Sequence, residues 1–343
     1  MAQTRKLVEV ADWTDELSAF RKLPRMVARA ERRQRQERIA ALTKSAEQSP
    51  DIAAKWLELA EQEKLDGQTK LAATHFGRGY SLKALTLARA GKFDEAIQSE
   101  ALATENEADV AALYFARALI AASQERDRDA VQLLGEALTR TPMKSSDRWQ
   151  VLSERAAAYS RLASGVSGTR QDWEKAQADF ESAIGSFPTP PSDNNVVAQQ
   201  TLAQLHFDHA MAWEALAVRD GSKVDLSRLA LAEKSLLTAT TLNSKEPRFA
   251  LSAGQNLMRQ VHNSAPGIAD LLDRAVSLLT TATKLDDTQV RANHAIIVKA
   301  MIELSARQAR EEAERKAREG ERTGAECCDF DARAAGFDIK VAS

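Results

Sequence analysis

The sequence predicts an all-α protein built from stacked helix-turn-helix repeats. Two observations predict this fold class: alanines recur seven residues apart with a large apolar residue between them, and prolines fall between the proposed helices. Positions i, i+4 and i+7 share one helix face, so a small–large–small triplet lets a neighbouring helix approach closely while one side chain fills the gap. The alanine pairs are Ala96/Ala103, Ala130/Ala137, Ala176/Ala183, Ala232/Ala239 and Ala275/Ala282, and the residues between the last four pairs are Leu134, Phe180, Leu236 and Leu279.

Composition supports the same fold class and excludes several others. Aromatic residues make up 5% and charged residues 28% of the 343 residues, and no run of alternating Val, Ile and Thr marks a strand. The net charge of −2 provides no global attraction to nucleic acid or membrane. No apolar stretch is long enough to span a membrane and the N-terminus lacks a signal-peptide core, so we expect a cytoplasmic protein. The only cysteines, Cys327 and Cys328, are adjacent and cannot form a long-range disulfide within the chain.

We expect four segments along the chain. Residues 1–50 form a basic helical extension, residues 51–287 the repeat domain, residues 288–319 a capping and charged C-terminal helix, and residues 320–343 a flexible tail. Repeats bury their apolar faces only by stacking, so a repeat domain of this length need not divide, and its terminal repeats need a cap with a polar outer face.

A period of 34 residues connects the two best-defined repeats. It aligns Tyr80 with Tyr114 and Ala84 with Ala118. The turn between the two helices of the first of these repeats reads Gly91-Lys92-Phe93-Asp94-Glu95-Ala96. In these positions the chain resembles the tetratricopeptide repeat family. The resemblance implies an α-solenoid of about five to six helix-turn-helix repeats, with helical extensions at both ends and a concave groove lined by the first helix of each repeat.

The remaining repeats match the pattern less evenly. A degenerate unit starts at Trp56, but its second helix would overlap the helix that carries Tyr80, so one of the two phases is expected to be wrong. Glu100 occupies a position where a large apolar residue is usual. A loop near residues 164–168 separates the helix of Tyr159 from the next helix, and the first helices of the last two repeats are indistinct.

The N-terminal stretch 21–38 holds eight basic side chains against two acidic ones. It reads either as an arm for nucleic acid or an acidic partner, or as a solvated helix face packed on the first repeat. No aromatic residue in this stretch is available to stack on bases, so nucleic acid is not the expected partner. We expect a helix start or a kink at Pro24.

We expect the C-terminal helix to carry an apolar stripe at its start and mainly charged residues beyond it. An apolar stripe caps the last repeat, and beyond it charged residues pair four apart, as in Arg307 with Glu311. Alanines between 306 and 317 form a narrow seam that leaves self-association open. The tail contains Asp329-Phe330-Asp331 and Phe337-Asp338-Ile339, which read as a docking motif or as an unstructured end. The capping stripe consists of Val290, Ile297, Met301 and Leu304.

Motifs that carry chemistry are nearly absent from this sequence. His206 and His209 stand three apart on one predicted helix, a weak metal pair that lacks the spacing of zinc proteases. Gly91-Lys92 lacks the flanking residues of a phosphate loop. We therefore expect no catalytic residues, no metal, no cofactor and no enzyme activity.

The family resemblance implies which side chains line the concave groove. The residues that hold a terminal carboxylate in tetratricopeptide co-chaperones have no counterpart at the equivalent positions here, so binding of chaperone tails is not expected. The predicted function is a noncatalytic scaffold or adaptor that binds a peptide or helix of a protein partner; the alternatives are a nucleic-acid-associated protein using the basic arm and a noncatalytic subunit of an enzyme assembly. The predicted groove residues are Arg78, Ser81, Leu85, Arg89, Phe115, Leu119, Ser153, Arg161, Phe207 and Met211.

Overall fold

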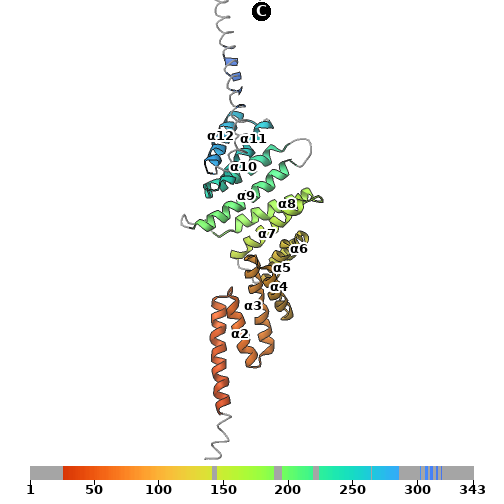
Figure 1. The fold of residues 1–343 in the computed structure, drawn as a ribbon, viewed down its shortest axis with the longest axis vertical. Helices are drawn as coiled ribbons and strands as arrows, with labels where there is room; N and C mark the ends of the chain where they lie inside the picture. The colour runs from red at the N-terminus through yellow and green to blue at the C-terminus, as the bar shows by residue number, and fades with distance from the viewer. Residues whose placement is uncertain are drawn as a thin grey trace, which may run out of the picture. The chain divides into compact units, whose positions relative to one another are not determined.

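The computed structural model describes residues 26–140, 145–188, 195–218, 224–263 and 265–285, and single positions between 302 and 318. All regular secondary structure in these residues is helical, which confirms the all-α prediction (Figure 1). Residues 26–48 form a helix, followed by α2 (Ala53–Leu65), α3 (Thr69–Arg89), α4 (Phe93–Glu105), α5 (Ala111–Ser123), α6 (Asp127–Thr139), α7 (Ser145–Ser164), α8 (Arg170–Ser186), α9 (Val196–Val218), α10 (Leu226–Leu242), α11 (Pro247–His262) and α12 (Ile268–Leu285).

Several predictions for the chain ends lie outside the described residues. These concern Pro24, the C-terminal capping stripe and the tail. Two of the predicted charge pairs are described, because Arg307 lies 2.7 Å from Glu311 and Arg318 lies 3.7 Å from Glu314.

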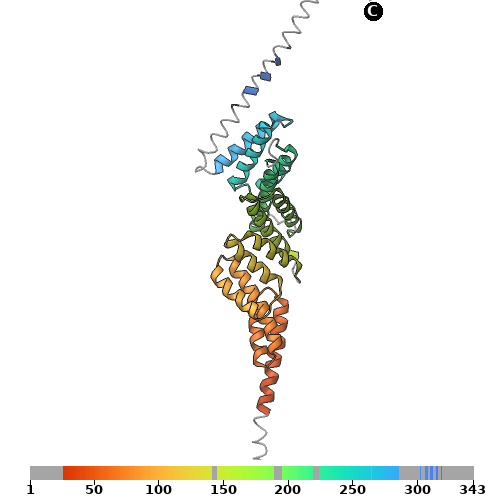
Figure 2. The ribbon, with the colours of Figure 1, turned by 90° about the vertical axis from the view of Figure 1, so that its right-hand side faces the viewer.

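The chain forms two compact units, Met1–Gly168 and Thr169–Ser343. In the first unit the helix over residues 26–48 runs alongside α2, and its first half extends beyond α2 (Figures 1 and 2). Ile39, Leu42 and Ala46 in the second half pack against Trp56 and Leu59 of α2. The basic stretch is therefore attached to the first repeat by apolar contacts at its C-terminal end.

Helix α3 resolves the conflict between the two repeat phases. It is 21 residues long and carries both the buried Ala72 of the degenerate unit and the buried Ala84 of the following repeat. It packs against α2, α4 and α5. The expectation that one phase is wrong is thereby corrected, because a single long helix completes one helix pair and begins the next.

The small–large–small triplets lie where the repeat geometry requires. All ten alanines of the five pairs are fully buried, and the four large residues between the last four pairs are no more than 2% exposed. Glu100, which breaks the pattern of the first pair, accepts a salt bridge from Arg117 of α5 at 2.6 Å. The helix faces predicted from the alanine spacing are confirmed.

The turns that follow α2, α3 and α5 each contain one residue in the left-handed backbone conformation. Gly67 between α2 and α3 has φ +82°, and Gly91 between α3 and α4 has φ +73°. Thirty-four residues after Gly91, Glu125 takes the same position with φ +59°. Glycine adopts this conformation without a Cβ clash, whereas an L-residue is strained there by about 1–2 kcal/mol.

In the second unit, successive helices from α8 to α12 pack against one another. The long helix α9 contacts both α8 and α10, so apolar residues surround it and obscure the helical period in the sequence. A buried polar network joins the later helices: Asn256 donates to Glu214 at 2.7 Å, and Gln260 donates to Glu233 at 2.8 Å. These buried polar residues explain why the first helices of the last repeats are indistinct in the sequence.

Candidate partner-binding pocket

A pocket of about 540 Å³ opens along α3 in the first unit. Its walls come from α3, the start of α5, α7 and the turn before α2, so four segments far apart in sequence meet there. We call it the α3 pocket. Its lining consists of Pro50, Asp51, Arg78, Leu82, Leu85, Thr86, Arg89, Val110, Ala111, Ala112, Phe115, Asp147 and Val151.

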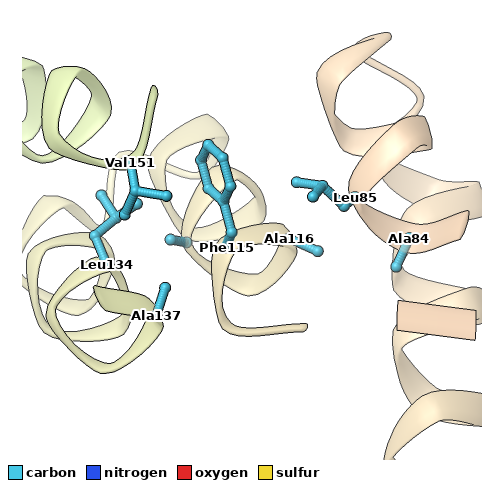
Figure 3. Packing of buried hydrophobic residues seen from close by; sticks show 8 residues of the cluster. Ala84, Leu85, Phe115, Ala116, Leu134, Ala137 and Val151 are labelled. Atoms are coloured by element: carbon cyan, nitrogen blue, oxygen red, sulfur yellow. The ribbon is translucent and has the colours of Figure 1, made fainter. Parts of the chain in front are cut away.

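The inner surface of the α3 pocket is apolar. Phe115 of α5 lies between Leu85 of α3 and Val151 of α7, within one hydrophobic cluster (Figure 3). Phe115 is 4% exposed, so its ring belongs to the core and one edge reaches the pocket. The half-buried Leu82 and Val110 extend the apolar surface outward. Such a surface binds an apolar side chain by removing it from water.

Two guanidinium groups lie at this apolar surface. Arg78 stacks over the ring of Trp56 at 4.0 Å, and Arg89 stacks over the ring of Phe115 at 5.1 Å. Arg89 also donates a hydrogen bond to the side-chain oxygen of Gln150. Trp56 donates from its indole nitrogen to the carbonyl oxygen of Pro50 at 2.9 Å, which holds the turn at the pocket edge in place.

Burial dominates the electrostatics of both arginines. It lowers the pKa of Arg89, an effect that Asp147 and Glu154 oppose, and it lowers the pKa of Arg78, an effect that Asp51 opposes. Arginine nevertheless stays charged at neutral pH. Burial also raises the pKa of Glu154, against the effects of Arg161 and Arg89. The pocket thus contains two partly desolvated cations.

Four of the predicted groove residues meet in the α3 pocket: Arg78, Leu85, Arg89 and Phe115. Ser81 does not join them, because it is fully buried and its hydroxyl donates to the carbonyl oxygen of Gly77 at 2.7 Å. This serine is therefore part of the core and does not line the pocket.

Leu119 also lies away from the pocket lining. It packs with Phe93 on the cluster formed by Ala88, Ala96 and Ile120. Phe115 lines the pocket and also belongs to the core, whereas Leu119 is half-buried outside the pocket lining, so its role in partner binding stays a prediction.

The other predicted groove residues lie outside the lining of the α3 pocket. Ser153 is half-buried on α7 and is not part of the pocket lining, and Arg161 pairs with Asp127 of α6 at 2.8 Å. Phe207 and Met211 belong to the second unit and pack on the cluster of Ala210, Ala232, Leu236 and Ala253. Their roles in partner binding stay predictions.

The sequence reasoning missed most of the pocket lining. Leu82 was detectable, because Arg78, Leu82, Leu85 and Arg89 follow a spacing of four, three and four along one helix face. Val110, Asp147 and Val151 carry no such signal. Only the tertiary arrangement of α5 and α7 around the pocket brings them to the residues of α3.

The two histidines of α9, His206 and His209, are both half-buried. The indole nitrogen of Trp213 donates to His209 Nε2 at 3.1 Å, and His209 Nδ1 lies 3.1 Å from the hydroxyl of Ser235. An indole nitrogen only donates, so Nε2 accepts and the proton is on Nδ1. Burial lowers the pKa of His209 to about 4, and burial also lowers the pKa of His206. Within the described residues, no group of three or more potential metal ligands is present.

The basic stretch is partly neutralised by the first repeat. Arg38 pairs with Glu58 at 3.2 Å, and Arg35 lies 3.8 Å from Asp66. Both carboxylates belong to α2 or to the turn that follows it. The described helices include none long and apolar enough to cross a bilayer.

Comparisons with known proteins give no sequence match and only distant structural similarities. No protein-family model and no curated protein sequence matches this chain. Among solved structures it is similar to a chain of the Cut9–Hcn1 hetero-tetramer of the APC/C, with 13% identity and a TM-score of 0.44 over 77% of this chain and 46% of that one. This chain thus corresponds to less than half of that protein.

Two further structures give comparable values. YrrB, described as a TPR protein with an unusual peptide-binding site, has 14% identity and a TM-score of 0.43 over 74% of this chain and 97% of its own. PilF from Pseudomonas aeruginosa has 15% identity and a TM-score of 0.38 over 67% of this chain and 91% of its own. The fold is tetratricopeptide-like. That conclusion rests on the buried alanine triplets and the 34-residue recurrence of the turn described above.

Proposed function

We propose that this tetratricopeptide-like chain is a noncatalytic adaptor that binds an apolar segment of a partner protein in the α3 pocket. The observation that supports it is the combination of a 540 Å³ pocket, an apolar inner surface and two guanidinium groups at that surface. Pockets of this size accommodate one or two large side chains, and a few polar groups set their orientation. A segment of a partner protein offers both large apolar side chains for the inner surface and polar groups for the two guanidinium groups.

The pocket is best tested by filling it, because truncation would damage the core. Phe115 is 4% exposed, so Phe115→Ala is expected to destabilise the fold by about 3–5 kcal/mol. Ala111 is only half-buried and lines the pocket at the first residue of α5. Ala111→Phe fills the space and leaves the core side chains unchanged. Ala101→Phe, on the exposed face of α4, is the matched control.

The test is a random-peptide display selection against the full chain, followed by binding measurements on the enriched peptides. We expect Ala111→Phe to weaken their binding at least tenfold and Ala101→Phe to leave it unchanged, with equal thermal midpoints for the two variants. Apolar binding should vary little with salt, whereas phosphate binding through the basic stretch would weaken steeply. Enriched peptides that bind Ala111→Phe as tightly as the unmodified chain would contradict the proposal.

A further inference from the structure

The helix over residues 26–48 has an attached half and a free half. Ile39, Leu42 and Ala46 pack on α2, whereas every residue from 26 to 34 is exposed. The free half extends beyond α2 (Figures 1 and 2). We call residues 26–34 the free helical segment. Because none of its residues is covered by another described element, a partner can approach it from any side.

The free helical segment carries a local positive charge. It holds three arginines and one glutamate, a formal charge of +2. Within the described residues, Arg29 and Arg32 form no salt bridge. Arg33 lies 3.1 Å from Glu37 of the same helix, but the two side chains are 83% and 67% exposed, so solvent and salt screen this pair. The three guanidinium groups are therefore available to an anionic partner.

Helix geometry determines where these guanidinium groups point. Successive residues of an α-helix are about 100° apart around its axis, so Arg32 and Arg33 point to two different sides. Arg29 points between them, and Glu31 lies on the opposite side of the helix. A matching partner therefore places negative charge on two sides of the helix at once. A flat acidic surface reaches one side, whereas a groove with charged walls reaches both.

The major groove of duplex DNA meets these requirements. It is about 12 Å wide and admits an α-helix, whose diameter is about 10–12 Å. The phosphates of the two strands provide negative charge on both sides of the groove. The lack of an aromatic residue in the basic stretch disfavours single strands, which bind by stacking, but a duplex is contacted through its phosphates and base edges.

Two other anionic partners fit the free helical segment less well. Duplex RNA has a deep and narrow major groove that side chains do not read. An anionic membrane binds an amphipathic helix through a large apolar face. The large apolar residues of the segment are Met26 and Val27, which are adjacent and so point about 100° apart. They form no apolar stripe along the helix.

We propose that the free helical segment binds in the major groove of duplex DNA, with Arg32 and Arg33 at the phosphates of opposite walls and Arg29 at the base edges. The whole chain has a net charge of −2, so the attraction is confined to this segment and binding is strongest at low salt. The segment contributes no residue to the α3 pocket, so this inference is independent of the proposed function.

The test is a titration of a fluorescent 20-base-pair duplex with the full chain at several salt concentrations. We expect the triple variant Arg29→Gln, Arg32→Gln and Arg33→Gln to weaken binding at least tenfold at low salt. The slope of log affinity against log salt should become shallower by about two, because two phosphate contacts are lost. Equal thermal midpoints of variant and unmodified chain show that the fold is intact.

A matched control removes the same charge elsewhere in the first unit. Arg126, Arg128 and Arg148 are exposed and lie outside the free helical segment. Replacing all three with glutamine should change DNA affinity less than twofold, and Ala111→Phe in the α3 pocket should leave it unchanged. Equal effects of the two triple variants, or no DNA binding at low salt, would overturn the inference.

Further ligands test the groove and the kind of partner. A duplex containing glucosylated hydroxymethylcytosine has sugars in its major groove, and we expect it and duplex RNA to bind at least fivefold more weakly than unmodified DNA. Equal binding of the glucosylated duplex would refute insertion into the groove. Tighter binding to polyglutamate or to phosphatidylserine vesicles than to DNA, lost in the triple variant, would assign the segment to an acidic protein or to a membrane instead.

Discussion

Gly254 of α11 lies close against α12 and offers a stability test worked from the structure. A Cβ built on Gly254 would lie 2.6 Å from Leu279 Cγ and 2.8 Å from Leu279 Cδ2, and 3.3 Å from the carbonyl oxygen of Ala275. Leu279 is fully buried, so its branch point has no free space to move into. Gly254→Ala must therefore displace α12 or force a strained rotamer, which costs about 1–3 kcal/mol.

The same substitution has the opposite effect where the helix has room. Gly135 lies in the interior of α6, and a Cβ built there would meet only the tip of Arg155 at 4.0 Å. Gly135→Ala should stabilise the protein by about 0.5–1 kcal/mol, because alanine is the better helix former. Since Gly254→Ala gains the same propensity, the difference between the two variants isolates the overpacking cost.

The assay is urea denaturation of both variants with a double-mutant cycle. Leu279→Ala alone should cost about 2–5 kcal/mol. In that background Gly254→Ala should no longer be destabilising, because the side chain it meets has been removed. Equal effects of Gly254→Ala and Gly135→Ala in the unmodified chain would show that α11 and α12 do not approach as closely as described.

Three further predictions concern stability, each measured by urea denaturation. Glu125→Gly should raise the free energy of unfolding by about 0.5–1 kcal/mol by removing left-handed strain, and Gly91→Ala should lower it by about 1–2 kcal/mol. If both substitutions changed the free energy of unfolding in the same direction, this reasoning would be contradicted. Ala176→Leu should lower it by about 1–3 kcal/mol, whereas the exposed Ala178→Leu should change it little. Burial lowers the pKa of His209 to about 4 from an ordinary 6.5, so the unfolded chain binds the proton at a higher pH than the folded chain. On the order of 1–3 kcal/mol of stability is therefore present above pH 6.5 and is lost as the pH falls to about 4. His209→Gln should reduce this pH dependence, of which His206 keeps a part because burial also lowers its pKa, and an unchanged pH profile would refute the assignment.

The sequence alone determined the helices that carry the alanine pairs and their buried faces. Ala130, Leu134 and Ala137 are all buried because helix geometry fixes which positions share a face, and that geometry acts within a few residues along the chain. The turn at Gly91 was equally readable, since glycine adopts a left-handed backbone without strain. Such local rules hold whatever the helix packs against.

The α3 pocket depended on information that the sequence does not carry locally. The family resemblance assigned Arg78, Ser81 and Arg89 to the groove; Arg78 and Arg89 line the pocket, whereas Ser81 is fully buried. A helix has several faces, and which one stays open depends on the number of helices packed around it. Helix α3 packs against α2, α4 and α5 because it serves two repeats, and this long-range packing decides that its arginines, and not its serine, reach the pocket.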